Sequence, residues 1–301
     1  MKKILFSILA ALIFFSCKTD TTAVSSDSSS SEYAIALDNL TANPGKESAT
    51  NYIKSVRKVI SSSDDAAKTK EYLMKGLSVA EEYKMGPTAI GFLMPLLKSY
   101  PNTPKKEEYT AKLASALSDI GKKIPSDVLI DAYVNQYPNG KYKDLLMKKQ
   151  TEKIENVDTF LVNLAKNIFV NPDKFGINRL AAQKYVDACE AYALGNKDSG
   201  MAPEYLYRAA EMARTLKTYP KALNIYDWIE AEYPNYEKSA TTMFLKGFML
   251  ENELNDKESA RKVYQAFITR FPKSELQDDV KFLLDNIDKS DEEIMKLIEK
   301  K

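Results

Sequence analysis

The chain has 301 residues, of which 44% are hydrophobic and 28% are charged, and its 43 basic and 42 acidic residues leave a net charge of +1. This near-neutral balance argues against a general nucleic-acid-binding protein, which needs a strongly basic face. The sequence contains no histidine, which excludes Ser-His-Asp and Cys-His catalysis and nearly all catalytic zinc sites. It also lacks phosphate-binding and dinucleotide-binding loops. We therefore expect a protein that is not an enzyme and that holds no cofactor and no metal.

The N-terminal residues have the pattern of an export signal. Two lysines precede the apolar run Ile4–Phe15, which is broken by a single serine. This length suits a secretory signal peptide and is too short to span a bilayer. A serine and then Cys17 follow, and this arrangement resembles the lipobox of bacterial lipoproteins. The resemblance implies a signal peptide over residues 1–16 and acyl chains such as palmitate on Cys17; an ordinary secretory signal with an incidental cysteine is the alternative.

The residues after the lipobox are expected to form a tether over 17–31. This segment is rich in serine and threonine and has no apolar periodicity to offset the cost of ordering it. No later stretch is apolar for long enough to cross a membrane. Lys18, where enteric lipoproteins of the inner membrane have aspartate, implies by the same resemblance an anchor in the outer membrane, with the protein facing the periplasm.

Regularly spaced prolines indicate an internal repeat. Pro101 and Pro138 are 37 residues apart, Pro234 and Pro272 are 38 apart, and each follows an aromatic residue. At two fixed distances before these prolines the residue is usually small, and at two other fixed distances it is large. A small residue followed four positions later by a large one places both on one helix face, and proline ends the helix. The framework residues chosen from this pattern are Gly76, Ala89, Tyr100, Ala209, Ala222, Tyr226, Tyr233, Gly247, Ala260, Tyr264 and Phe271.

This pattern resembles the tetratricopeptide repeat, in which a large residue, two small residues, an aromatic residue and a proline recur in a helical hairpin. The resemblance implies an all-α fold, a solenoid of helical hairpins with about 12–13 helices. Residues 202–287 also look like the helical-repeat proteins of the bacterial envelope. Those are the lipoprotein of the outer-membrane barrel-assembly machine and the periplasmic coordinator of the Tol–Pal system.

The repeat is interrupted in the middle of the chain. Pro138 and Pro234 are 96 residues apart, which is not a whole number of repeats. We therefore expect an N-terminal helical-repeat arm over 46–172 and a C-terminal tetratricopeptide-repeat arm over 177–301. The path of the chain across the break is left open.

Tyrosine is the most prominent candidate for binding, with 18 copies. The tyrosines of the repeat framework are expected to fill the core. Four that lie outside it are candidates for the lining of a concave groove that holds a peptide or helix of a partner. These four are Tyr185, Tyr192, Tyr207 and Tyr236. Cys189 is expected to be a buried small hydrophobic residue, because no histidine is present to activate it.

Together these patterns predict a lipid-anchored scaffold that binds envelope proteins through a helical-repeat groove, in the assembly or maintenance of the outer membrane. We expect no nucleic-acid partner, and contact with the membrane only through the lipid anchor. The alternative is a lipoprotein that binds a glycan or small ligand. Relatives of that kind carry long loop insertions, which this chain lacks.

Overall fold

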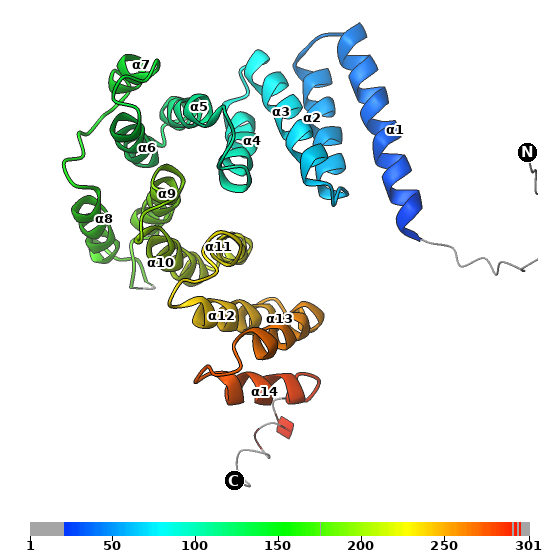
Figure 1. Cartoon of the computed structure of the whole chain (residues 1–301), viewed down its shortest axis with the longest axis vertical. Helices are drawn as coiled ribbons and strands as arrows, with labels where there is room; N and C mark the ends of the chain where they lie inside the picture. The colour runs from blue at the N-terminus through cyan, green and yellow to red at the C-terminus, as the bar shows by residue number, and fades with distance from the viewer. Residues whose placement is uncertain (1–20, 175, 291, 294, 296–301) are drawn as a thin grey trace, which may run out of the picture. The chain divides into compact units, whose positions relative to one another are not determined.

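The computed structural model describes residues 21–174, 176–290, 292, 293 and 295 (Figure 1). Within these residues the chain forms fourteen α-helices and one short 3-10 helix, η1, and no strand. The signal peptide and Cys17 lie outside the described residues. The helices are α1 Thr21–Ala42, α2 Lys46–Ser61, α3 Ala66–Glu82, α4 Gly86–Ser99, α5 Lys106–Asp119, α6 Lys123–Gln136, α7 Lys143–Met147, α8 Val157–Lys166, η1 Asn167–Phe169, α9 Arg179–Gly195, α10 Ala202–Thr215, α11 Tyr219–Glu232, α12 Ser239–Asn252, α13 Lys257–Arg270 and α14 Gln277–Asn286.

The all-α fold of successive helical hairpins is confirmed, although the helices exceed the expected number. Helix α7 has five residues, too few to show a helical period in the sequence. Helix α1 begins at Thr21, so the expected tether over 17–31 is wrong from that residue onward. The segment has no apolar stripe that could reveal a helix in the sequence, but its second half is held by contacts with other helices.

Those contacts lie in the first of two compact units, residues 1–83. Helix α1 packs on α2, and α2 packs on α3. The ring of Tyr33 lies 5.5 Å from that of Tyr52 and 4.9 Å from that of Tyr72. The buried hydroxyl of Ser29 lies 3.2 Å from that of Ser62. An aromatic cluster at Tyr33 and a polar contact at Ser29 therefore hold α1 against α2 and α3.

The second unit comprises residues 84–301 and continues through the place where we expected a break between two arms. Helix α9 packs on α6 on one side and on α10 on the other. A Cβ atom added to Gly195 would lie 2.4 Å from the Cβ of Ala132, so two small residues allow α9 to approach α6 closely. Helix α9 thus takes the place of the next solenoid helix, and the expected boundary between 172 and 177 is wrong.

The framework residues lie where helices meet. Five of them are fully buried in the second unit, with no exposed surface. Gly76 lies in α3 of the first unit, and Gly247 in α12 of the second. Tyr100, Tyr233 and Phe271 directly follow the last residues of α4, α11 and α13 and are half-buried. The five fully buried residues are Ala209, Ala222, Tyr226, Ala260 and Tyr264.

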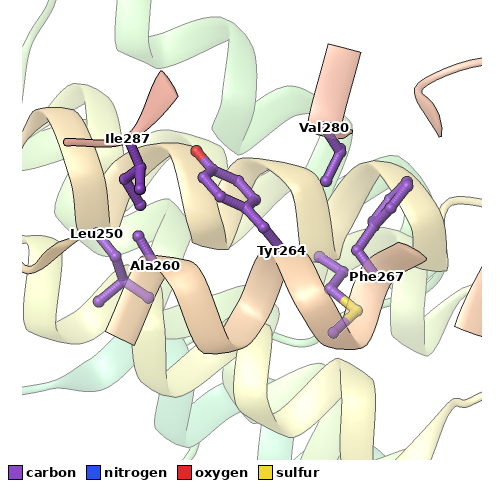
Figure 2. Packing of buried hydrophobic residues seen from close by; sticks show 7 residues of the cluster. Leu250, Ala260, Tyr264, Phe267, Val280 and Ile287 are labelled. Atoms are coloured by element: carbon purple, nitrogen blue, oxygen red, sulfur yellow. The ribbon is translucent and has the colours of Figure 1, made fainter. Parts of the chain in front are cut away.

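One hairpin shows how the small and large positions fit together (Figure 2). A Cβ atom at Gly247 would lie 2.5 Å from the ring of Tyr264, so α12 and α13 meet only because this position has no side chain. Phe267, Val280 and Ile287 complete the cluster around Tyr264. The contact therefore joins three successive helices into one core.

In three hairpins, the buried tyrosine makes the same kind of polar contact. Tyr264 donates a hydrogen bond of 2.7 Å to Glu251 on the preceding helix, and Tyr133 does the same to Glu107. Tyr226 donates to Glu211 in the equivalent place. Burial and the bond to Glu107 raise the pKa of Tyr133 to about 12, so the hydroxyl keeps its proton and remains a donor. The carboxylates satisfy hydroxyls that would otherwise be buried without a partner.

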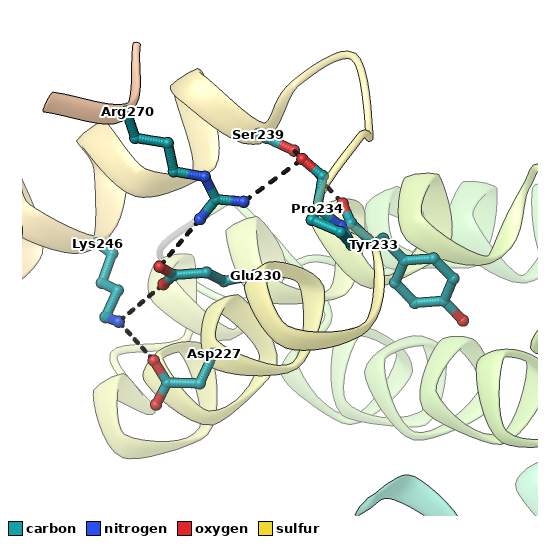
Figure 3. Close-up of polar contacts among 7 residues, drawn as sticks. All are labelled: Asp227, Glu230, Tyr233, Pro234, Ser239, Lys246 and Arg270. Atoms are coloured by element: carbon teal, nitrogen blue, oxygen red, sulfur yellow. Dashed lines mark hydrogen bonds and ion pairs between the residues drawn. The ribbon is translucent and has the colours of Figure 1, made fainter. Parts of the chain in front are cut away.

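A charged network joins α11 to the hairpin that follows it (Figure 3). Arg270 on α13 donates to Glu230 at 3.2 Å and to the carbonyl oxygen of Pro234 at 3.4 Å. Lys246 on α12 lies between Asp227, at 2.6 Å, and Glu230, at 3.2 Å. Burial alone would lower the pKa of Lys246, but the two carboxylates outweigh it and raise the pKa. Lys246 therefore stays charged while partly buried.

We expect Gly247→Ala to lower the free energy of unfolding by about 1–3 kcal/mol, because overpacking outweighs the gain in helix propensity. The ring of Tyr264 cannot move aside easily, since it is fully buried and bonded to Glu251. Urea denaturation followed by circular dichroism measures the change. Gly200→Ala is the control, because nothing lies within 4 Å of its added Cβ; equal effects for both variants would contradict the packing argument.

Candidate binding groove

One face of α9 lines a groove in the second unit. Leu180, Gln183, Asp187, Ala191 and Leu194 recur at intervals of three or four residues, which places them in a row along the helix. They line two adjoining hollows of about 380 and 190 Å³. Both hollows also include Lys122, Pro125 and Asp187. We call this continuous surface the α9 groove.

The walls of the groove are largely apolar. In the larger hollow, Ile124 and Pro125 at the start of α6 lie opposite Leu180 of α9. In the smaller one, Ile90 and Met94 of α4 lie opposite Leu194. Hollows of this kind accept apolar side chains, because each filled site removes hydrocarbon from water on both partners.

Two ion pairs cross the groove. Lys122 contacts Asp187 at 2.7 Å, and Lys221 of α11 pairs with Glu190. Burial raises the pKa of Glu190, and Lys221 opposes that shift. These pairs keep the middle of the groove polar between its two apolar ends.

Lys98, at the end of α4, lies beside these charges without a carboxylate of its own. Its ammonium donates to the carbonyl oxygen of Asn224 at 3.1 Å and lies 4.8 Å from the centre of the Trp228 ring. Within the described part of the chain, no ion pair to Lys98 is found. Burial lowers its pKa, and Lys221 lowers it further, whereas Glu190 raises it. A half-buried ammonium in such surroundings would gain from an anionic group on a ligand.

Two of the four candidate groove tyrosines belong to the core instead. Tyr185 and Tyr192 are each 4% exposed. The ring of Tyr192 lies 4.8 Å from that of Tyr205, and its hydroxyl lies 2.9 Å from Ser199. The expectation that they line a groove is wrong because α9 is covered on two sides, by α6 and α10. Cys189, on the same helix, is fully buried, and burial raises the pKa of its thiol.

The other two, Tyr207 and Tyr236, lie outside the α9 groove and meet around Glu204. This carboxylate accepts hydrogen bonds from Tyr236 at 2.5 Å, Lys238 at 2.6 Å and Arg208 at 2.7 Å. The ammonium of Lys238 also lies 5.0 Å from the centre of the Tyr207 ring. The cluster borders an open depression of about 860 Å³ between the loops that precede α10 and α12. The cluster ties the first turns of α10 to the segment that precedes α12.

Glu204 has the most strongly stabilised charge of this cluster. Burial alone would raise its pKa, but the bonds from Lys238, Tyr236 and Arg208 outweigh burial and lower the pKa to about 2. The negative charge of Glu204 is therefore part of what holds α10 to the segment before α12, and it persists to low pH.

We expect Glu204→Gln to lower the free energy of unfolding at pH 7 by about 1–3 kcal/mol. The folded pKa, about 2, is below the unfolded value near 4.3. The stabilisation is thus complete above pH 5 and disappears as the pH falls toward 2. Urea titrations across this range should show the gap between wild type and variant closing. The exposed Glu237→Gln serves as the control, and a gap independent of pH would contradict the assignment.

The described residues contain no cluster of potential metal ligands. None of the helices within the described ranges is long and apolar enough to span a membrane.

The α9 groove has a signal in the sequence that repeat spacing alone does not detect. The row from Leu180 to Leu194 mixes polar and apolar residues, whereas the adjacent face of the same helix carries tyrosines, valine and cysteine.

Comparison with known proteins identifies the repeat. Residues 241–274, which cover most of α12 and all of α13, match the family model described as tetratricopeptide repeat. The chain contains a tetratricopeptide repeat. A solved structure of the TPR2AB domain of yeast Sti1 in complex with pHSP90 is similar at 14% sequence identity and a TM-score of 0.29. That match covers 87% of this chain and 98% of the other. No curated protein matches the chain.

Proposed function

We propose that this protein is a non-enzymatic scaffold, anchored by lipid in a bacterial cell envelope, that binds a protein partner in the α9 groove. The observation that carries the proposal is the groove itself, with apolar hollows on either side of paired charges, in a chain that contains a tetratricopeptide repeat. Repeats of this type present a surface formed by several stacked helices. Such a surface suits a segment of another protein better than a reacting small molecule.

The chemistry of the groove narrows the kind of segment that fits. The hollows at Leu180 and Leu194 favour apolar side chains spaced along a helix or an extended chain. Beside the paired charges, the ammonium of Lys98, which has no carboxylate partner among the described residues, favours a carboxylate on the partner, which would form a charge-assisted hydrogen bond. We therefore propose a partner segment that carries apolar residues on both sides of an acidic one.

The lipid anchor is supported by the sequence alone. A basic start, an apolar run of signal-peptide length and a small residue before Cys17 support acylation at that cysteine. Lys18 favours the outer membrane, facing the periplasm. The resemblance of residues 202–287 to helical-repeat proteins of envelope machines favours a role in the assembly or maintenance of that membrane.

The groove is tested by photo-crosslinking in cells. A photoreactive residue at Gln183, in the groove, should capture a specific envelope protein, whereas one at Gln265, exposed on α13, should not. Adding Lys98→Met should reduce capture at least about tenfold, because a charge-assisted bond is lost. The same change should alter the free energy of unfolding by less than about 1 kcal/mol, because methionine keeps the packing against Trp228 and removes a buried charge.

Equal capture from both positions, or capture indifferent to Lys98→Met, would contradict binding in the groove. Absence of capture in cells where the protein is abundant would favour the glycan or small-ligand alternative. A thermal shift of the purified protein with cell-wall fragments would then support that alternative.

The anchor is tested separately with Cys17→Ala. Acyl chains hold a protein at a bilayer with about 0.8 kcal/mol for each buried methylene. Wild-type protein should therefore sediment with membranes and gain the mass of acyl chains at residue 17. The variant should lack that mass, and retention of an uncleaved N-terminus would be visible in the same spectrum. An unmodified Cys17 in the wild-type protein would refute the anchor.

A further inference from the structure

Helix α8 and the turn after it expose apolar side chains that the fold does not use. Val162, Phe169, Val170 and Leu180 are 44%, 68%, 53% and 67% exposed. We call these four residues the α8 patch. Helix α8 and η1 already contribute a different face to the core, with Leu161 and Leu164 of α8 and Ile168 of η1 buried.

The patch is one surface built from two elements. Val162 and Phe169 are seven residues apart, which places them on the same side of the turn from α8 into η1. Asn178, which precedes α9, donates to the carbonyl oxygens of Ile168 at 2.7 Å and Val170 at 3.1 Å. These bonds close the intervening loop and bring the start of α9, with Leu180, beside the end of η1. Figure 1 shows α8 at the outer edge of the second unit.

The surroundings of the patch are basic. Between residues 163 and 184 the sequence has four basic residues and one acidic residue, Asp173. Lys166 contacts the side-chain oxygen of Asn163 at 3.3 Å. Within the described part of the chain, neither Lys166 nor Lys184 forms an ion pair. Lys184 is one helical turn from Leu180, so charge and apolar surface lie side by side. The four basic residues are Lys166, Lys174, Arg179 and Lys184.

We propose that the α8 patch docks on the surface of a bilayer that contains anionic phospholipid. Phe169 and Leu180 would enter the headgroup region, and the lysines would contact phosphates. Exposed phenylalanine and leucine among basic residues are the composition of interfacial membrane contacts, and anionic lipid supplies the opposite charge. This contact borders the α9 groove, with which it shares Leu180, and adds a second attachment to the lipid at Cys17. The docking of the α8 patch depends on the proposed function in one respect only, which is the anchor that keeps the chain near a bilayer.

The test uses the purified full chain with Cys17→Ser, in vesicles of phosphatidylcholine with and without phosphatidylglycerol. A nitroxide is attached at Val170→Cys or, as the control, at Leu254→Cys, which is 38% exposed in the wild type. Cys189 is fully buried and does not compete for the label. The apolar run Ile4–Phe15 holds this chain at the vesicle, so the result does not depend on acylation. Mass analysis of Cys17 in the wild type decides the anchor independently.

With anionic vesicles, we expect the label at position 170 to become more accessible to oxygen and less accessible to a water-soluble nickel complex. The label at position 254 should not change. Replacing Lys166→Gln or Lys184→Gln should weaken the docking equilibrium about fivefold each, and Phe169→Ser about tenfold.

Three results would overturn the proposal. The label at position 170 could remain as accessible to the nickel complex as the label at position 254. Docking could be the same on pure phosphatidylcholine and indifferent to the lysine substitutions, which would refute the recognition of anionic lipid. The label at position 170 could also become shielded from the nickel complex without vesicles, and more so at higher protein concentration. That result would assign the patch to contact with a second copy of the chain.

Discussion

The architecture depends on the close approach of helices at small residues, as where Gly247 on one helix meets the buried ring of Tyr264 on the next. At Gly247 this contact leaves no room for a Cβ atom, and the ring of Tyr264 fills the space. The hydroxyl of that ring must still be satisfied, and Glu251 accepts its hydrogen bond. This hairpin therefore satisfies both the packing and the hydrogen bonding of its buried tyrosine, and the same bond to a glutamate recurs at Tyr133 and Tyr226. The rest of the solenoid can vary its turns and surface, because the spacing between helices is already set.

The same helix that closes the middle of the solenoid also forms the groove. Helix α9 needs a covered face, with Tyr185 and Tyr192, to pack between α6 and α10. Its remaining face is left to line the space between α4, α6 and α11. The carboxylates on that face are held in place by Lys122, directly before α6, and by Lys221 of α11. Preorganised charges of this kind lose little freedom when a partner binds.

The spacing of prolines and small residues was enough to predict helical hairpins and their framework, because those positions follow directly from helix geometry and steric limits. It was not enough to place the helix between Pro138 and Pro234, where no repeat period applies. A helical period also shows which residues share a face, but not which face meets the core. Tyr185 and Tyr192 illustrate this limit, since their size suited a groove and a core equally well. The helix α1 was missed because it depends on contacts of Tyr33 with residues far along the chain.

The ammonium of Lys98, beside the α9 groove, separates stability from function. A framework residue such as Tyr264 is explained fully by the fold that it supports. Lys98 is not, since burial disfavours its charge and its partners are a carbonyl oxygen and a ring. A buried charge that the fold leaves without an opposite charge is one that a ligand would complete. Beside the α9 groove, the ammonium that the fold leaves without a carboxylate is therefore the place where a partner has most to contribute.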